Sequence, residues 1–168
     1  MPPHRYSALN SAIQAFAASR PGAWLFARTA HRLDHLALAL SGGRRMMGSF
    51  LTGLPVLTLT TTGAKSGLPR TLPLIYIRDP LQPGTFALIA SNFGQRHYPG
   101  WYFNLKAHPQ ATCTIDGHSA AYIAHEATGE EYERFWQCAA ETYRGYPLYK
   151  QRVTWRRVPV MVMTPAPQ

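Results

Sequence analysis

The chain has 168 residues, 46% of them hydrophobic, so it can form one domain with a substantial core and is too apolar to be disordered. Seventeen Lys and Arg residues against eight Asp and Glu give a formal net charge of +9, which indicates an anionic partner. Nucleic acid, an anionic membrane surface and a multiply charged small molecule all fit that description. The basic residues are dispersed, with only Arg44-Arg45 and Arg156-Arg157 adjacent, and this disfavours nucleic acid.

The N-terminal segment, residues 1–45, is predicted to form a helical extension. Apolar residues recur at helical spacing from residue 7 to about residue 41, with a break at residues 20–22. A basic amphipathic stretch of this kind packs on its own domain, covers an active site or lies on an anionic bilayer. Its longest apolar part, residues 23–40, contains charged residues that a membrane span would exclude. We therefore expect a cytoplasmic protein, with peripheral contact to the inner face of the membrane as an alternative.

Residues 46–168 are predicted to form one domain of about six strands. The expected strands are residues 56–62, 70–78, 85–91, 111–116, 118–126 and 158–165. The last must be central because it is continuously apolar, and Asp116-Gly117 predicts a tight hairpin between the fourth and fifth. Hairpin connections, with one helix before the final strand, favour an α+β, mainly β fold: a small antiparallel barrel rather than a doubly wound sheet.

The helix before the last strand is predicted to begin at a capping box. The Thr128 hydroxyl can bond the third helical N–H, while Glu131 reaches back to the first residue of the box. Gly145 is expected to end this helix. The aromatic and apolar residues that recur at helical spacing are Tyr132, Phe135, Trp136, Ala139 and Tyr143. We interpret Trp136 as core packing rather than as a cofactor contact.

A basic turn joins the first two expected strands, in the sequence TTTGAKSGLPRT at residues 60–71. Glycines let backbone N–H groups approach an anion closely, and Lys65 and Arg70 supply positive charge. The glycine spacing is not that of a P-loop. The turn is therefore a candidate phosphate cradle, and the alternative is a surface hairpin whose basic side chains face only water.

A second candidate segment is IASNFGQRHYPGWYFNL, residues 89–105. A strand ends there on Ala90 and Ser91, and a glycine-containing loop leads into a short helix that carries Trp101 and Asn104. Small residues, exposed N–H groups and an aromatic side chain at a strand end suit the binding of a planar ring rich in heteroatoms.

A third segment, TYRGYPLYK, carries tyrosines at every third position. A tight backbone such as a 3₁₀ turn would line up the phenols of Tyr143, Tyr146 and Tyr149 along one side. The alternative is that they are ordinary half-buried aromatic residues whose hydroxyls reach the surface.

Other motifs are weak or missing. His31 and His35 have a helical spacing that can hold zinc, but they have no third ligand at a recognisable position, so no metal site is predicted. Gly-x-Ser-x-Gly, a Cys–His pairing and GxGxxG are all missing from the sequence, which gives no support to hydrolase and Rossmann assignments. Cys113 and Cys138 lack CxxC spacing and are interpreted as reduced, buried thiols.

Taken in order, these segments resemble the deazaflavin-dependent nitroreductase family, whose members are split β-barrels that use the deazaflavin coenzyme F-420. The resemblance runs from about Val56 to Pro165, through GAKSGLPR, ASNFGQRHYPGWYFNLKAHPQ, the capping-box helix, YRGYPLY and RRVPVMVMTP. It implies an FMN-binding split-barrel-like fold and hydride transfer to a quinone, enone or nitroaromatic acceptor. It also implies that the N-terminal helices lie near the membrane and the substrate entrance.

The resemblance implies particular site residues. The residues matched to coenzyme binding are Lys65, Ser66, Arg70, Pro73, Ala90, Ser91, Asn92, Trp101 and Asn104, with Lys65 and Arg70 as contacts to the phosphate side. Those matched to catalysis are Tyr146 as the donor of a proton or hydrogen bond, Ser91 beside the ring, and Tyr143 and Tyr149 as pocket walls. Ala64 and Asn92 stand where relatives often carry a basic residue, which predicts weaker binding or a different preference for the coenzyme's tail length.

Three alternatives stay open on the sequence alone. One is a reductase of the same barrel type that uses FMN, and another is a carrier that binds the coenzyme without reducing an acceptor. The third is a basic nucleic-acid-binding barrel, which the tyrosines and the basic turn disfavour. The oligomeric state, monomer or homodimer, is likewise left open.

Overall fold

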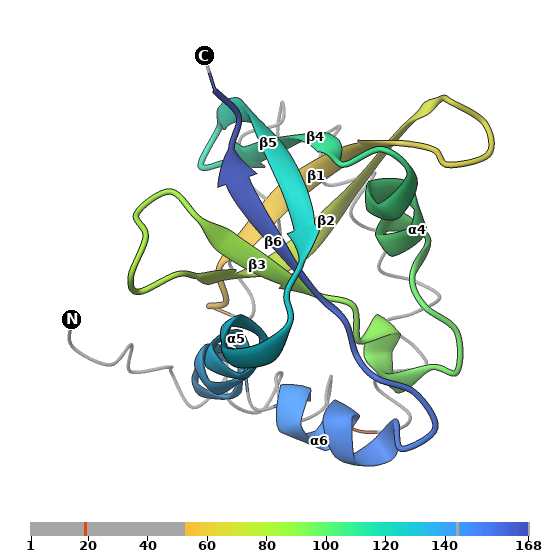
Figure 1. Ribbon diagram of the computed structural model, residues 1–168, viewed down its shortest axis with the longest axis vertical. Coiled ribbons are helices and arrows are strands. Elements are labelled where there is room, and N and C mark those ends of the chain that lie inside the picture. The colour runs from red at the N-terminus through yellow and green to blue at the C-terminus, as the bar shows by residue number, and fades with distance from the viewer. Residues whose placement is uncertain (1–18, 20–52, 144, 168) are drawn as a thin grey trace.

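The computed structural model describes Ser19 and residues 53–143 and 145–167 (Figure 1). The elements are β1 (Val56–Thr62), β2 (Pro69–Arg78), β3 (Phe86–Ile89), the 3₁₀ turn η1 (Asn92–Gly94), α4 (Gly100–Ala107), β4 (Gln110–Ile115), β5 (His118–Glu126), α5 (Gly129–Thr142), α6 (Gly145–Arg152) and β6 (Val160–Pro165). The expected N-terminal helices, the pair His31 and His35, and the proposed boundary between residues 45 and 46 lie outside the described residues.

The six strands close into a barrel in the order β1-β2-β3-β6-β5-β4, and every neighbouring pair is antiparallel. This confirms the predicted mainly β barrel, including a last strand with a neighbour on each side. At the predicted hairpin, Asp116 and Gly117 have φ angles of 50° and 83°. Two consecutive positive φ angles characterise the turn that matches the twist of its flanking strands, so the hairpin prediction is also confirmed.

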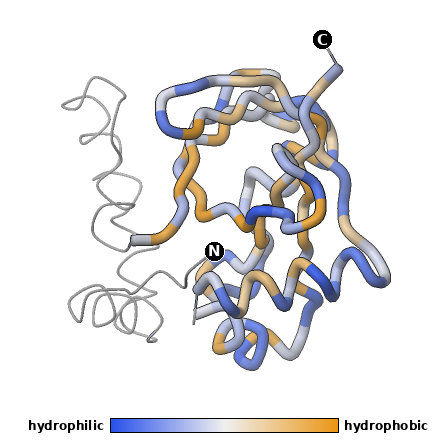
Figure 2. The backbone as a smooth tube through the Cα atoms, turned by 90° about the vertical axis from the view of Figure 1, so that its left-hand side faces the viewer, coloured by the Kyte–Doolittle hydropathy of each residue, from blue (hydrophilic) through white to orange (hydrophobic). Residues whose placement is uncertain are grey.

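Strands β3 and β6 are buried on both faces, which explains their continuously apolar sequences. Leu88 and Met161 belong to the cluster inside the barrel, whereas Ala87 and Val162 belong to a second cluster under α5 and α6. In the hydropathy view, apolar segments run through the strands and hydrophilic ones are frequent in the connecting loops (Figure 2). A strand that faces two apolar layers has no polar side to alternate with.

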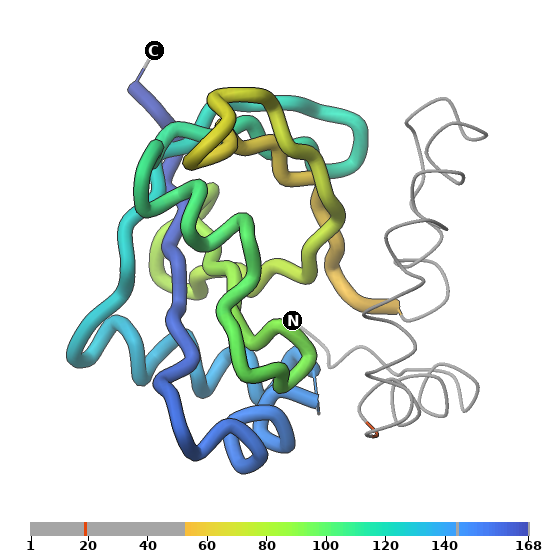
Figure 3. The backbone as a smooth tube through the Cα atoms, turned by 90° about the vertical axis from the view of Figure 1, so that its right-hand side faces the viewer, coloured from red at the N-terminus to blue at the C-terminus, as the bar shows by residue number. Residues whose placement is uncertain are grey.

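The helices cover two different parts of the barrel. Helix α5 buries Phe135 and Trp136 in the outer cluster, so the interpretation of Trp136 as core packing is confirmed. Helix α4 buries Trp101 and Leu105 in the inner cluster and contacts β1 and β5. Figures 1 and 3 show α4, η1 and α6 following one another along the same side of the molecule.

The predicted capping box is wrong in its hydrogen bonds, although the helix begins where expected. Thr128 has the extended backbone of an N-cap residue, but its side chain makes no capping hydrogen bond. The Glu131 carboxylate pairs with His125 Nε2 on β5, at 3.0 Å for the shorter contact. Glu131 thus pairs with a histidine on the neighbouring strand instead of with the backbone at the start of its own helix.

Two predicted boundaries are also wrong. Helix α5 ends at Thr142, and Gly145, expected to stop it, instead begins the separate α-helix α6, so the tyrosines do not line a 3₁₀ turn. The strand expected to reach residue 91 ends at Ile89. The N–H of Ser91 turns back to the carbonyl of Ile89, and the next residue, Asn92, has a φ of 48°, so the chain leaves the barrel there.

Gly145 is required at its position for a steric reason. A Cβ built on it would overlap the ring and hydroxyl of Tyr143, which lies against the backbone at the start of α6. An interior as densely packed as a protein core cannot absorb such an overlap without moving the ring. The lack of a side chain at Gly145 therefore leaves room for the Tyr143 ring, and the residue does not terminate a helix.

We expect Gly145→Ala to lower the free energy of unfolding by about 1–3 kcal/mol, because the added methyl group overpacks the Tyr143 ring. Denaturant unfolding measures this change. Gly100→Ala is the matched control: a Cβ there meets no atom within 4 Å, and alanine favours helix more than glycine does. Equal stability of the two variants would contradict the assignment of Gly145 to a close contact.

Candidate active site

The basic turn between β1 and β2 is a closed loop. Gly63 N–H donates to the carbonyl of Leu68 at 2.9 Å, and Gly67 N–H donates to the carbonyl of Gly63 at 2.8 Å. A Cβ on Gly63 would lie 2.5 Å from the Ser66 hydroxyl oxygen and 3.1 Å from the Leu68 carbonyl, so a side chain there would displace that hydroxyl and crowd the backbone. The loop geometry thus favours a glycine at its first position.

Asn104 on α4 fixes this loop from the side. Its Oδ1 accepts the N–H of Ala64 at 3.0 Å, and its Nδ2 donates to the Thr61 hydroxyl at 2.9 Å. Thr61 is itself only 2% exposed, at the end of β1. Asn104, predicted as a coenzyme contact, therefore has both ends of its amide engaged with the loop and its strand.

The predicted anion contacts on this loop are exposed. Lys65 and Arg70 take part in none of the ion pairs or cation–π contacts found among the described residues, and the Arg70 stem runs beside Gly63. Ser66 uses its hydroxyl to accept the N–H of Leu68 at 3.3 Å. The loop consequently carries two exposed cations that pair with no described carboxylate, on a backbone fixed by its own hydrogen bonds and by Asn104.

The segment after β3 forms a second loop. Ala90 is fully buried in the inner cluster and Ser91 is 7% exposed. Asn92 donates from its side chain to the carbonyl of His97 at 3.0 Å, which closes the loop on itself. Asn92 and Phe93 both have positive φ angles, 48° and 54°, which side-chain-bearing residues rarely adopt. The sequence could not show this strained backbone.

Sequence analysis missed the residue that holds this loop, Arg156. Its guanidinium donates to the carbonyls of Ser91 and Gln95 at 3.0 Å each and to that of Ala90 at 3.4 Å. The guanidinium carbon also lies 4.6 Å from the ring centre of Tyr98, and burial lowers the pKa of Arg156. The only signal in the sequence was an arginine pair directly before an apolar strand.

The tyrosines gather in one buried group, so the alternative that they are half-buried is wrong. Tyr143, Tyr146 and Tyr149 are 5%, 4% and 2% exposed. The hydroxyls of Tyr143 and Tyr149 are 3.3 Å apart, and the rings of Tyr143 and Tyr146 meet edge-on with centres 5.3 Å apart. Burial raises the pKa of all three phenols, which therefore stay protonated well above neutral pH.

The tyrosine group and the second loop lie against each other. A Cβ built on Gly94 would lie 3.7 Å from Tyr149 Cδ1 and 3.9 Å from Val153 Cγ2, both near or on α6. The basic loop, α4, the loop after β3 and α6 thus form one continuous side of the molecule, seen in Figure 3. The predicted site residues fall into three groups along it.

Two predicted residues lie deeper. Trp101 is 5% exposed and packs in the inner cluster, while Pro73 is half-buried in β2 opposite Thr58 of β1. Neither presents an open face comparable to that of the basic loop. They shape the barrel wall behind the three groups.

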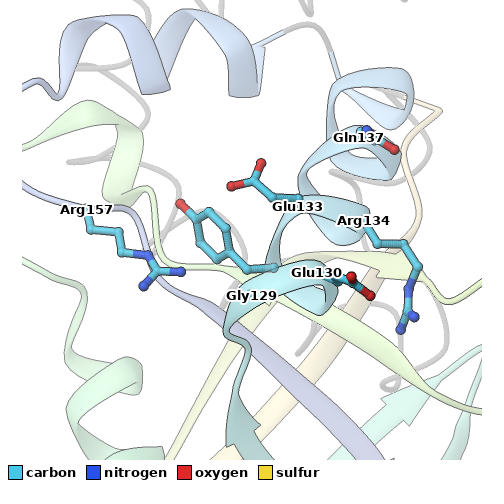
Figure 4. A pocket seen from close by; sticks show the side chains of 7 residues that line it. Gly129, Glu130, Glu133, Arg134, Gln137 and Arg157 are labelled. Carbon is cyan, nitrogen blue, oxygen red and sulfur yellow. The ribbon is translucent and has the colours of Figure 1, made fainter.

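A surface pocket of about 550 Å³ lies elsewhere, along the outer side of α5 (Figure 4). Its lining residues are Gly129, Glu130, Tyr132, Glu133, Arg134, Gln137 and Arg157. None of them was predicted as a site residue, and its walls carry both acidic and basic groups. Arg157 reaches toward the first turn of α5, with its guanidinium carbon 3.9 Å from the ring centre of Tyr132.

Within the described part of the chain, the His, Cys, Asp and Glu side chains form no cluster that could hold a metal ion. Over the same residues, no helix combines the length and the apolar character needed to cross a membrane. The two cysteines predicted to be buried thiols differ in their burial. Cys113 is buried, and burial raises the pKa of its thiol to about 12, whereas Cys138 is only half-buried.

Comparison with solved structures places this geometry among reductases. An F420-H2-dependent reductase structure is 37% identical, covers 65% of this chain and 93% of its own, and superposes with a TM-score of 0.59. A chain described as a domain-swapped dimer is 32% identical, with 85% and 98% coverage and a TM-score of 0.60. The barrel is therefore of the type used by F420-dependent reductases.

Sequence comparison gives the family. The family profile for F420H(2)-dependent quinone reductase matches residues 32–165. An F420H(2)-dependent quinone reductase of Mycobacterium tuberculosis strain H37Rv is 37% identical over 113 residues, 66% of this chain and 73% of that protein. A putative one from the same strain is 30% identical over 121 residues, 72% and 98% of the two chains. The chain belongs to the F420H(2)-dependent quinone reductase family, a family of oxidoreductases that depend on the reduced coenzyme.

Proposed function

We propose that this protein transfers hydride from reduced coenzyme F-420 to a quinone, and that enones and nitroaromatic compounds are further acceptors. The observation that carries the proposal is the basic loop, whose exposed Lys65 and Arg70 form no ion pair with any carboxylate in the described part of the chain. Through α4 this loop is joined to the side of the molecule that also holds Ser91 and the tyrosines. Family membership supplies the chemistry.

The residues present suit a phosphate-bearing, polyanionic coenzyme. The N–H groups of Gly63 and Gly67 are used inside the loop, so its lysine and arginine side chains are what offer point charge and forked hydrogen bonding to phosphate oxygens. The net charge of +9 adds a long-range attraction for such a ligand. When bound, a deazaflavin supplies two electrons as hydride because a carbon replaces the central flavin nitrogen.

We assign the coenzyme residues to two roles. Lys65, Ser66 and Arg70 bind the phosphate side, and Asn104 positions their loop through Thr61 and Ala64. The residues proposed to form the walls near the ring are Pro73, Ala90, Ser91, Asn92 and Trp101. Since Ala90 and Trp101 are buried in the barrel core, their contribution is to shape the floor rather than to donate hydrogen bonds.

We assign Tyr146 as the proton donor, with Ser91 beside the ring and Tyr143 and Tyr149 as walls. An acceptor that has received hydride carries negative charge, which a phenol can stabilise by a hydrogen bond and neutralise with its proton. Burial keeps Tyr146 protonated because it raises the pKa of the phenol. A hydrogen bond from this phenol to the acceptor would also be stronger than one in water, since burial excludes water from the group.

Two rival functions use the same barrel. An FMN-dependent reductase would bind FMN in preference to the deazaflavin. A carrier would bind the deazaflavin tightly yet reduce no quinone. Binding and turnover measurements separate the three cases.

We predict that the purified protein quenches or shifts the fluorescence of coenzyme F-420 on titration and binds FMN much more weakly. Lys65→Ala and Arg70→Ala should each raise the dissociation constant about 10-fold, the effect of losing one charge-assisted hydrogen bond. Their affinity should also fall less steeply with added salt than that of the wild type.

Lys106→Ala is the matched control for this titration. Lys106 is an exposed lysine on α4 that pairs with Glu126 at 2.9 Å, so its loss should leave coenzyme affinity nearly unchanged. An equal loss of affinity in all three variants would point to general charge attraction and not to a binding loop. Preference for FMN would reject the coenzyme assignment.

We predict that Tyr146→Phe lowers kcat about 100-fold or more, the range of general acid catalysis, with the coenzyme dissociation constant unchanged. Tyr102→Phe is the control, because the Tyr102 hydroxyl donates to Glu126 at 3.0 Å, away from the tyrosine group. Loss of coenzyme affinity in Tyr146→Phe would make Tyr146 a binding residue instead.

The pH profile gives a second check on Tyr146. A phenol with an unperturbed pKa of 10 that burial raises further donates its proton at all lower pH values. The wild-type kcat should therefore show no loss attributable to this group until the pH exceeds 10. A kcat that falls with a midpoint near pH 7 would assign the proton donor to another residue.

The assembly and location of the protein are further proposals. We propose a homodimer, supported by the similar chain described as a domain-swapped dimer, and peripheral membrane contact through the helices expected in residues 1–45. Residues 46–168 are proposed as the coenzyme-binding domain. Sedimentation velocity should give the mass of two chains, and vesicles with anionic lipid should pull down the full chain at low salt. A monomeric mass would reject the proposed homodimer, and a lack of binding to such vesicles would reject the proposed membrane contact.

A further inference from the structure

We propose that Arg156 is a positioning residue of the active site, which acts by fixing the backbone of residues 90–95. This inference rests on the proposed coenzyme-dependent reduction, because those residues include the proposed ring contacts. Arg156 is not proposed to touch coenzyme or acceptor. It acts through the carbonyl groups that it binds.

The hydrogen bonds of Arg156 use the full capacity of its guanidinium. Nε donates to Gln95 O at 3.3 Å, Nη2 donates to Gln95 O and Ser91 O at 3.0 Å each, and Nη1 donates to Ala90 O at 3.4 Å and to the Arg157 carbonyl at 3.3 Å. These five bonds equal the number of guanidinium N–H groups. The five bonds end on four backbone carbonyls, since Gln95 O accepts two of them, so Arg156 binds main chain and not a neighbouring side chain.

The loop needs such a clamp because its backbone is unfavourable on its own. Asn92, Phe93 and Gly94 are three consecutive residues with positive φ, and the first two carry side chains. Such conformations cost free energy and persist only where surrounding contacts fix them. Arg156 binds the carbonyls on both sides of these three residues, at Ser91 and at Gln95.

An arginine is specifically suited to this task. Its five hydrogen bonds to four carbonyl oxygens exceed the three N–H donors of a lysine ammonium, which also lacks the planar fork of a guanidinium. The charge of Arg156 is balanced by those carbonyl dipoles and by the face of Tyr98, since no carboxylate within the described ranges forms an ion pair with it. Arg156 thus places a positively charged group against the Ser91 carbonyl.

The clamp also touches the tyrosine group through the loop. Gly94 lies against Tyr149, and Asn92 closes the loop on His97. If the clamp is lost, both Ser91 and the loop surface that supports α6 become free to move. Arg156 therefore supports both the proposed contacts to the coenzyme ring and the helix that carries the proposed proton donor.

The next residue, Arg157, provides a matched control within the same segment. Its guanidinium turns to the other side, over Tyr132 and into the pocket on α5 shown in Figure 4. Only its backbone carbonyl contacts Arg156, and a side-chain substitution leaves that carbonyl in place. Two neighbouring arginines with identical chemistry thus differ only in what they bind.

The test compares Arg156→Lys and Arg156→Gln with Arg157→Lys and Arg157→Gln in the full chain. Hydrogen exchange without coenzyme is followed at residues 91–98, with β3 and β4 as internal references. Coenzyme F-420 titration gives the dissociation constant, turnover with a short-chain benzoquinone gives kcat and KM, and denaturant unfolding gives stability. The lysine variant keeps the charge, so it remains informative if the glutamine variant fails to fold.

We expect Arg156→Lys to exchange faster at residues 91–98 alone, to bind coenzyme about 10-fold more weakly and to lose about 10- to 100-fold in kcat, as misplaced reacting groups do. KM for the quinone should change little. Both Arg157 variants should match the wild type in all these measurements. A general loss of stability would also lower the apparent kcat without changing KM, so the confinement of faster exchange to residues 91–98 is what separates the two cases.

Three results would overturn the inference. The first is that Arg156→Lys keeps the hydrogen-exchange rates and the coenzyme affinity of the wild type. The second is faster exchange throughout the barrel, with affinity that follows the unfolded fraction, which would make Arg156 a general stabilising residue. The third is an equal effect of the Arg157 variants. If the wild type binds no coenzyme, the proposed function fails, and exchange alone decides whether Arg156 fixes the loop.

Discussion

The whole arrangement depends on two strands that are buried on both faces. One face of β3 and β6 fills the barrel, and the other supports α5 and α6. Because burial of apolar surface is the main favourable term in folding, this pair of strands joins what would otherwise be two separate cores. The same pairing sets the place where β3 ends, and with it the start of the loop that carries Ser91. Architecture and site thus share a single constraint, the apolar contact on either side of one antiparallel pair.

The candidate site is built mainly from backbone held by a few side chains. Asn104 fixes the basic loop, Arg156 fixes the loop after β3, and Gly145 leaves room for the Tyr143 ring close to the start of α6. Each of these residues satisfies or shapes main chain instead of pointing into open space. Preorganised backbone of this sort keeps its geometry without a cost at the moment of reaction. The charges and phenols that are proposed to meet ligands are carried on these supports.

Patterns that depend on neighbours in sequence were predictable, and those that depend on distant partners were not. The alternation of the strands, the Asp116-Gly117 hairpin and the apolar last strand specify their own structure through local propensity and burial. The capping-box prediction was wrong because Glu131 pairs with a histidine on β5. The prediction that Gly145 ends a helix was wrong because the role of this residue is set by the Tyr143 ring. Arg156 was missed for the same reason: three of its four acceptor carbonyls lie more than sixty residues away in the chain. The family resemblance supplied the fold type and the chemistry, but it could not supply these contacts.

Closure of the barrel by β6 has a consequence for how the protein is made. This strand is synthesised after the other five, yet it pairs with β3 and with β5. Until it emerges from the ribosome, the nascent chain has two unpaired sheet edges and two incomplete apolar layers, the features by which partly folded chains associate with one another. Pairing across such a long stretch of chain is also slow, because the loop-closure entropy must be overcome first. The nascent chain is therefore open to such association for longer than one whose strands pair in the order in which they are made.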